Sequence, residues 1–307
     1  MTYFERCNIC PRYCKVNRKN NLGFCKSNDN IKISRAALHY FEEPCISGNN
    51  GSGAIFFSGC NLKCVFCQNY NISNKNFGKE ISIERLIEIF FELKEKGANN
   101  INLVTPTHFI SLIAQALKTA KEKGLDIPIV YNTSGYENIS SLKLLDGLID
   151  VYLPDLKFFD ENLAKKYLKA DNYFKIASEA IKEMYRQVGN ITFNKKGLIQ
   201  KGVIVRHLVM PGYTKDSKKI IKYLYDTYHD NIYLSIMNQY TPNHHLENYK
   251  EINRPLSNEE YDEVINYAID LGIENAFIQE GDTCSESFIP EFNLEGVEKN
   301  SFMKTNS

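Results

Sequence analysis

The sequence has no excess of charge of either sign, since 37 lysine and arginine residues balance 37 aspartate and glutamate residues over 307 positions. A chain without net charge has no overall field that would attract nucleic acid or a membrane surface, so we expect neither as a partner. No run of about 18 apolar residues is present to span a membrane. The first residues also lack the apolar core of a signal peptide. We therefore expect a cytoplasmic protein.

The cysteine pattern is not that of a disulfide scaffold. The nine cysteines are odd in number, and most stand in tight local groups. Such groups in a reducing compartment are typical of metal binding. Cys45 and Cys284 stand apart from the groups, and we expect them to be small buried side chains.

Three cysteines, Cys60, Cys64 and Cys67, follow the apolar run 54–57 with the spacing CxxxCxxC. Three thiols on one short loop can ligate three corners of an iron–sulfur cube and leave the fourth iron open to a substrate or cofactor. A structural zinc site is the alternative, but it needs a fourth ligand nearby and usually uses CxxC pairs. The spacing favours the cluster.

A second group of cysteines lies in an N-terminal segment that is too polar and too short to form a core. Its members are Cys7, Cys10, Cys14 and Cys25. A bound metal would hold such a segment together, and four thiolates satisfy either zinc or a second iron–sulfur cluster. The alternative is a flexible arm that carries reduced cysteines.

Strand-like apolar runs alternate with amphipathic helical stretches along most of the chain, which predicts an α/β fold with a parallel sheet. Ser82 and Ser257 are predicted helix N-caps, and one crossover, about 160–188, should contain two helices. The strands are expected at about 54–58, 100–104, 127–131, 149–153, 203–209, 231–236 and 275–278. Barrels and doubly wound sheets both fit this order, and both place their sites at the carboxyl ends of the strands.

Polar residues stand at those predicted strand ends. Arg206 is the most informative, because a guanidinium within an apolar strand needs a buried anionic partner, which a carboxylate-bearing ligand would provide. Asp155 and Lys157 point the same way on an extended segment and form either part of a ligand site or a structural ion pair. The glycine-rich stretch 48–53 precedes a strand, so we interpret it as a turn and not as a nucleotide-binding loop.

The segment Gly59–Asn69, the alternation that follows it and Asp155-Leu156-Lys157 together resemble the radical S-adenosylmethionine (SAM) enzymes, in the branch related to pyruvate formate-lyase activating enzyme. The resemblance spans about residues 35–280. Its most specific part is CxxxCxxC with an aromatic residue, Phe66, before the last cysteine. The segment 42–53 extends the likeness to a subgroup of activase-like proteins, for which it implies no substrate.

The resemblance implies a partial (β/α)6 TIM-like barrel over residues 48–280, preceded by a small cysteine-rich metal-binding module at 1–47 and followed by a tail at 281–307 that packs on or near the barrel. It also implies a 4Fe-4S cluster on Cys60, Cys64 and Cys67 whose open iron chelates the amino and carboxylate groups of SAM. One-electron reduction would cleave SAM to methionine and a 5′-deoxyadenosyl radical, which abstracts hydrogen from a substrate.

The same resemblance assigns cofactor-binding roles residue by residue. Asp155 and Lys157 match an element that helps to hold SAM, Arg206 matches a basic residue near the methionine carboxylate, and Phe66 would border the adenine.

Three expected SAM-binding positions differ from the pattern of the family. Thr105 and the two residues after it replace a glycine-rich element that meets the SAM amino group, so hydroxyls or carbonyls would make that contact. Asn132 replaces an aspartate of the activases. Tyr240 stands where they carry a histidine on the ribose side, and a tyrosine can donate the same kind of hydrogen bond.

The resemblance leaves the substrate open. An activase that places a glycyl radical on a partner enzyme competes with an enzyme that modifies a peptide or small molecule directly, and both would take electrons from a low-potential donor such as flavodoxin or ferredoxin. From another class, a zinc-binding interaction or nucleic-acid-binding module is the alternative, which the neutral charge disfavours. We expect the segment 280–292, with Phe288, Ile289, Pro290 and Phe292, to line or close the barrel mouth.

Overall fold

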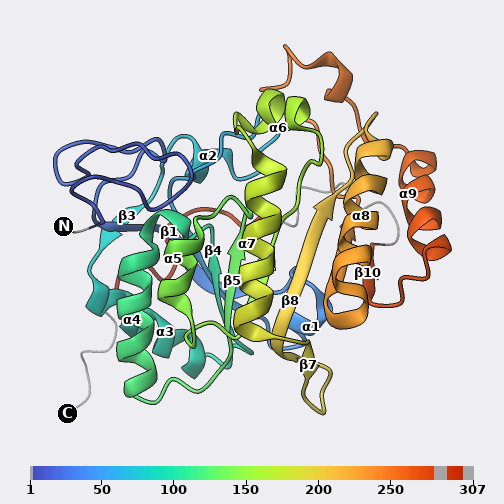
Figure 1. The fold of residues 1–307 in the computed structure, drawn as a ribbon. Coiled ribbons are helices and arrows are strands. Elements are labelled where there is room, and N and C mark those ends of the chain that lie inside the picture. Colours follow the sequence, from blue (N-terminus) through green and yellow to red (C-terminus); the bar gives the residue numbers. More distant parts are fainter. Residues whose placement is uncertain (1–2, 280–288, 300–307) are drawn as a thin grey trace, which may run out of the picture.

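A single sheet with helices packed on its outer face forms the body of the protein in the computed structural model, which describes residues 3–279 and 289–299 (Figure 1). The strands are β1 (Ile31–His39), β2 (Ser52–Phe57), β3 (Lys79–Ile81), β4 (Ile101–Val104), β5 (Ile129–Thr133), β6 (Val151–Pro154), β7 (Thr192–Phe193), β8 (Ile199–Leu208), β9 (Tyr233–Met237) and β10 (Ala276–Ile278). The helices are α1 (Pro44–Ser47), α2 (Tyr70–Ser73), α3 (Ile83–Glu95), α4 (Ile110–Glu122), α5 (Ile139–Leu142), α6 (Glu161–Leu168), α7 (Tyr173–Val188), α8 (Thr214–Tyr228) and α9 (Asn258–Asp270).

The strands follow the order β10-β9-β8-β6-β5-β4-β2-β1-β3, and β7 pairs with β8 outside this path. Every pair from β2 to β10 along the path is parallel, whereas β1 is antiparallel to β2 and to β3. Within the described residues the two ends of the sheet, β10 and β3, do not pair with each other. The sheet is therefore open, which agrees with the predicted partial barrel.

The local signals in the sequence are confirmed. The seven predicted strands are all present, and both α6 and α7 lie in the crossover between β6 and β8. The side chain of Ser82 accepts a hydrogen bond from the amide of Arg85, and Ser257 forms a capping box with Glu260. The expected turn after α1 leads into β2.

Three strands, β1, β3 and β7, lie outside the predicted set. The largest of them, β1, pairs with β2 over the register from Ile33 opposite Phe57 to His39 opposite Ser52. It belongs to the sheet although it falls within the segment 1–47.

The short helix α1 fills the inside of the sheet at the amino ends of the parallel strands, where Figure 1 draws it near the beginning of β8. Cys45 and Ile46 are buried there in an apolar cluster, as expected for Cys45. The other members of the cluster are Val130, Val151, Leu153, Ile199 and Ile204. Cys284 and Phe288 lie outside the described residues. None of the helices in the described ranges combines the length and the apolar character that a bilayer span needs.

The N-terminal segment packs against loops at the opposite end of the sheet, the carboxyl ends of the parallel strands (Figure 1). The fully buried Arg18 donates a hydrogen bond of 2.6 Å to the carbonyl of His108, after β4. Arg12 donates to the carbonyl of Asn61 at 2.7 Å, and Ser141 in α5 donates to that of Ile9 at 2.6 Å. These contacts place the N-terminal cysteine group beside the loop that follows β2.

Candidate active site

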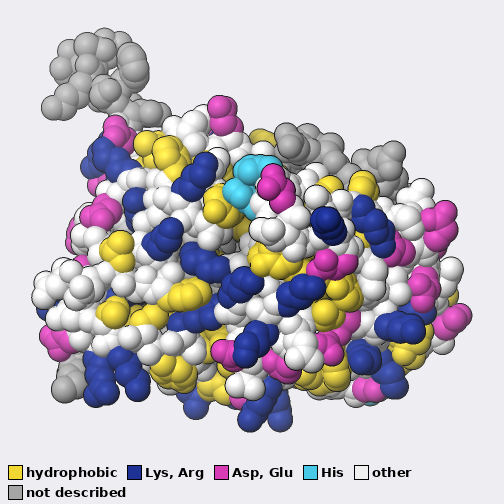
Figure 2. All heavy atoms as spheres, turned by 90° about the horizontal axis from the view of Figure 1, so that it is seen from above, with side chains coloured by type: hydrophobic (Ala, Val, Ile, Leu, Met, Phe, Trp, Pro, Cys, Tyr) yellow, Lys and Arg dark blue, Asp and Glu magenta, His cyan; other side chains and the backbone are white. Residues whose placement is uncertain are grey.

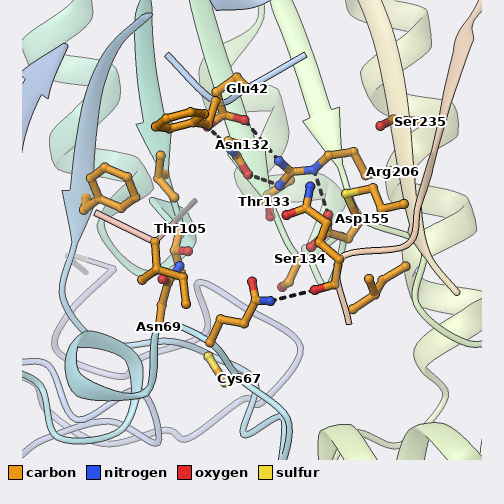
Figure 3. A pocket seen from close by; sticks show the side chains of 18 of the residues that line it. Glu42, Cys67, Asn69, Thr105, Asn132, Thr133, Ser134, Asp155, Arg206 and Ser235 are labelled. Atoms are coloured by element: carbon orange, nitrogen blue, oxygen red, sulfur yellow. Dashed lines mark hydrogen bonds and ion pairs between the residues drawn. The ribbon is translucent and has the colours of Figure 1, made fainter. Parts of the chain in front are cut away.

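A cavity of about 540 Å³ lies at the carboxyl ends of the parallel strands and extends into the sheet (Figure 3). Its size falls within the roughly 300–1,000 Å³ of small-molecule sites. The lining comes from β2, β4, β5, β8, β9 and β10, from the residues that follow β6, from the loop after β2 and from the end of β1. Of the residues predicted for the site, it includes Cys60, Cys64, Phe66, Cys67, Thr105, Asn132, Asp155, Lys157 and Arg206.

The three cysteines of the CxxxCxxC loop line one end of this cavity. The amide of Leu62 donates to the sulfur of Cys60 at 3.3 Å, and the Cys67 sulfur lies 3.2 Å from the Ser73 hydroxyl. Burial raises the pKa of Cys60 to about 11, so its thiolate needs a positive charge, such as a metal provides. Over the described ranges, no three or more cysteine, histidine or carboxylate side chains have the arrangement of a site for a single metal ion.

Gly59 before the first cysteine brings the N-terminal segment into direct contact with the loop. Its φ of +89° is in the left-handed region, and a Cβ placed on it would lie 2.5 Å from both the carbonyl of Cys25 and the hydroxyl of Ser27. Only glycine fits this approach without strain.

The four N-terminal cysteines are close enough to influence one another. Burial raises the pKa of Cys10, and the neighbouring thiols of Cys25, Cys7 and Cys14 raise it further. The eight described cysteines are all free of disulfides.

Arg206 stands at the centre of a buried polar network (Figure 3). Its guanidinium donates to Asp155 at 3.0 Å, to Glu42 at 3.2 Å and to the side-chain oxygen of Asn132 at 2.6 Å. Lys157 donates to the other oxygen of Asp155 at 2.6 Å. The anionic partners that Arg206 requires are therefore supplied by the chain itself.

The opposite charges in this network stabilise the ionised forms of their neighbours. Burial raises the pKa of Asp155, but Lys157 and Arg206 together bring it below its ordinary value. Burial lowers the pKa of Arg206, and the carboxylates of Asp155, Glu43 and Glu42 raise it above its ordinary value. Asp155 and Arg206 are thus held as ions inside the cavity wall.

Thr105, directly after β4, has an unusual backbone conformation. Its φ of +59° is in the left-handed region, where a β-branched residue is strained. A glycine would adopt this backbone conformation at position 105 without strain.

Phe66 and Tyr240 lie together, but only Phe66 reaches the cavity. Their ring centroids are 6.2 Å apart. Tyr240 is buried, and its hydroxyl donates to the carbonyl of Ile252 at 2.7 Å. The structure places Tyr240 outside the cavity lining.

Two carboxylates that had no predicted role, Glu42 and Glu43, line the cavity. Figure 3 shows Glu42 at the end away from Cys67. Both carboxylates follow β1, which was not among the predicted strands. Two adjacent acidic residues between an apolar run and Pro44 were the available signal.

The segment 289–299 returns to the body of the protein beside β1. The amide of Leu294 donates to the carbonyl of Ser34 at 3.0 Å, and Phe292 packs on Phe56 with ring centroids 5.4 Å apart. Ile289 and Pro290 line the cavity.

In a comparison with protein families, the model of the radical SAM superfamily matches residues 54–224. The chain is 33% identical over 276 residues to an uncharacterized protein of Methanocaldococcus jannaschii, covering 86% of this chain and 75% of that protein. It is 27% identical over 182 residues to a pyruvate formate-lyase-activating enzyme of Clostridium pasteurianum, covering 55% of this chain and 66% of that enzyme.

Among solved structures, the fold is similar to that of Streptococcus suis SuiB bound to S-adenosylmethionine, with a TM-score of 0.50 and 17% identity. The match covers 72% of this chain and 48% of SuiB, so the chain spans about half of that protein. SuiB bound to its precursor peptide SuiA matches with a TM-score of 0.50 and 16% identity, over 73% of this chain and 47% of SuiB.

Proposed function

The chain belongs to the radical SAM superfamily, and from that premise we propose that it cleaves S-adenosylmethionine reductively and abstracts a hydrogen atom from a substrate. In this proposal Cys60, Cys64 and Cys67 hold a 4Fe-4S cluster. When bound, the cluster and SAM supply a 5′-deoxyadenosyl radical for each electron taken up. The observation that carries the proposal is that the three thiols line the same cavity as a buried, charged side-chain network.

The side chains of the cavity can bind a zwitterionic cofactor. Asp155 and Lys157 present opposite charges 2.6 Å apart, which complement an ammonium and a carboxylate. Arg206 holds Asp155 in place. Thr105 offers a backbone carbonyl and a hydroxyl, and Asn132 an amide, beside these charges. Phe66 supplies an apolar surface for the adenine and, with the buried Leu62, excludes water from the radical.

We propose a second metal site at Cys7, Cys10, Cys14 and Cys25, and the proximity of the four thiols supports it. Zinc and a second iron–sulfur cluster remain the two candidates. Iron, sulfide and zinc analysis of protein purified without oxygen distinguishes them. The Cys10→Ala variant leaves the three-cysteine loop intact. If this variant loses the metal that the wild type contains beyond one 4Fe-4S cluster, that metal belongs to the N-terminal cysteines.

The electron donor would bind on the face that carries the N-terminal segment, α2 and α6. Figure 2 shows this face with lysine and arginine side chains over its middle and most acidic side chains toward its rim. Exposed lysines of these elements are Lys15, Lys26, Lys75, Lys165, Lys166 and Lys169. A low-potential protein with an acidic surface, such as flavodoxin or ferredoxin, is the partner that this charge attracts. The disulfide-free cysteines support a reducing, cytoplasmic location.

Two substrate classes compete within this function. The likeness to a pyruvate formate-lyase-activating enzyme supports an activase that forms a glycyl radical on a partner protein. The likeness in fold to SuiB, which was solved with its precursor peptide, supports direct modification of a peptide. A zinc-binding interaction module is not supported, because the family match over residues 54–224 includes the three-cysteine loop.

Anaerobic reconstitution with iron and sulfide tests the proposal. We expect visible charge-transfer absorption and formation of 5′-deoxyadenosine and methionine from SAM under a strong reductant. Cys60→Ala, Cys64→Ala and Cys67→Ala should each abolish both. Cys45→Ala is the matched control, since Cys45 is buried in an apolar cluster away from the cavity lining and should retain both. Absence of 5′-deoxyadenosine from the iron-loaded wild type would refute the proposal.

A further inference from the structure

The turn between β1 and α1 forms the end of the cavity that lies away from the cysteine loop. Because α1 fills the inside of the sheet, the two residues before Pro44 are carried to the cavity wall. Figure 3 shows Glu42 and Cys67 at opposite ends of the site. A molecule that occupies the whole cavity would therefore meet the cysteine loop at one end and Glu42 and Glu43 at the other.

Both carboxylate oxygens of Glu42 accept hydrogen bonds from other side chains of the protein. One of its oxygens accepts from Asn102 at 2.9 Å and from Asn132 at 3.3 Å, and the other accepts from Arg206 at 3.2 Å. Its side chain connects β4, β5 and β8. Glu42 thus has a structural explanation that needs no ligand.

Glu43 has no such explanation. Its residue is only 9% exposed, and its oxygen Oε2 is buried with no hydrogen-bond partner among the described residues. Burial raises the pKa of Glu43 above its ordinary value; the charge of Arg206 opposes this shift most strongly, and a hydrogen bond from Ser235 opposes it less. A buried carboxylate oxygen without a donor is costly, and a group of this kind in a cavity wall indicates a missing partner.

Arg206 is the cation that acts most strongly on Glu43, but among the described residues it makes ion pairs with Asp155 and Glu42 and none with Glu43. The charged groups of the described cavity wall are the carboxylates of Glu42, Glu43 and Asp155 and the cations of Lys157 and Arg206. Lys157 pairs with Asp155, and Arg206 pairs with Asp155 and Glu42. Burial lowers the pKa of His39, also in the wall, to about 4, so this imidazole is neutral at pH 7. Glu43 is therefore the carboxyl group of the described cavity wall that has no ion pair.

The cavity wall that includes Glu43 also has apolar side chains, and some of them reach the surface. Phe56, Leu208 and Phe277 line the cavity, and the half-exposed Tyr40 and Phe41 lie at its edge. An apolar stem would contact the aromatic wall while a polar head reaches Glu43.

We infer that Glu43 binds a cationic nitrogen of the substrate, an ammonium or a guanidinium carried on an apolar stem. The inference rests on the proposed radical SAM function and adds the substrate class to it. A lysine or arginine side chain of a peptide and a free alkyl amine share this chemistry. Glu43 acts as a binding residue, and hydrogen abstraction would occur on the stem, between Glu43 and the cysteine loop.

Calorimetric titration of the iron-loaded protein with hexylammonium, hexylguanidinium, hexanol and hexanoate, at saturating SAM, tests this. We expect the wild type to bind at least one of the two cations at least about tenfold more tightly than hexanol, as for a hydrogen bond to a charged group. Glu43→Gln, which keeps the shape of the side chain, should remove this preference. Glu247→Gln, an exposed position outside the lining, is the matched control and should keep it. A lysine-containing and an arginine-containing hexapeptide, each compared with its norleucine analogue, then distinguish a peptide from a free amine.

Three outcomes would overturn the inference: no preference for either cation in the wild type, an unchanged preference in Glu43→Gln, or cation binding that is seen in a parallel titration without SAM and is abolished by SAM. The last would assign Glu43 to the SAM amino group. Ser235→Ala serves as a second variant if Glu43→Gln loses its iron, and it should weaken the preference by a smaller factor. The titration needs no turnover, so a failure of SAM cleavage would refute the proposed function without deciding the role of Glu43.

Discussion

The protonation of Glu137 should make the stability of this protein depend on pH. This side chain follows β5 and is only 2% exposed. Its oxygen Oε1 accepts hydrogen bonds from Thr107 at 2.6 Å, from Thr133 and from Tyr131. Burial raises its pKa to about 7, although these three donors lower it. At a pH between the ordinary pKa of a glutamate and this value, Glu137 keeps its proton in the folded protein and releases it in the unfolded chain.

The size and sign of the effect follow from this difference. A rise from an ordinary value of 4.5 to about 7 corresponds to about 3 kcal/mol. Because the folded-state pKa is the higher one, the stabilising contribution is fully present below a pH of about 4.5 and is lost as the pH rises through about 7. At pH 8 the folded state contains the ionised, buried carboxylate of Glu137, and the free energy of unfolding is lowered by the full cost of burying this charge.

Replacement of Glu137 by glutamine removes the titration. We would measure apparent thermal midpoints of the iron-loaded wild type and Glu137→Gln anaerobically, at one scan rate, from pH 5 to pH 8. The midpoint of the variant relative to wild type should rise by about 5 °C over this range, at roughly 2 °C for each kcal/mol in a chain of this size. Glu179→Gln on the exposed face of α7 should show no such trend. A variant-minus-wild-type difference that stays constant with pH would refute the reasoning.

Three further predictions concern the site. Arg206→Met leaves the buried carboxylate of Glu42 without its cation and Asp155 with Lys157 alone. It should lower the free energy of unfolding by about 3–5 kcal/mol in chemical denaturation, whereas stability like that of the wild type would show that Glu42 protonates at little cost. Thr105→Gly relieves a strained backbone and should leave the thermal midpoint within about 3 °C of wild type; loss of calorimetric SAM binding in this variant would assign that contact to the hydroxyl. Gly59→Ala should separate the N-terminal segment from the cysteine loop and lower the iron content. Gly97→Ala has a similar φ of +85° with nothing within 4 Å of the added Cβ, so equal effects of the two substitutions would refute the contact argument.

Much of the fold could be predicted because its signals are local. The caps at Ser82 and Ser257 depend on residues within one helical turn, and the parallel strands appear as short apolar runs. The strand β1 was missed for a physical reason. It is held by antiparallel pairing with β2 and β3 and by the distant segment around Leu294, and none of these contacts leaves a mark within its own sequence.

The candidate site was predicted in part for a similar reason. Parallel strands bring their carboxyl ends to one edge, so Asp155, Lys157 and Arg206 could be expected to lie together. Tyr240 was expected beside them, but after the strand the chain directs its hydroxyl to Ile252. The direction of the Tyr240 side chain depends on the conformation of the loop that follows β9, and this loop has no repeating sequence pattern.

The sequence by itself determined the cysteine spacing, the alternation of strands and helices and, through these, the kind of chemistry to expect. Only the tertiary structure decided what surrounds that chemistry. Glu42 and Arg206 are 164 positions apart, and their contact depends on how α1 enters the sheet and on the register of β8. The same packing leaves Glu43 buried without a donor on Oε2 among the described residues. Contacts of this range arise from packing of the whole chain, which no local pattern encodes.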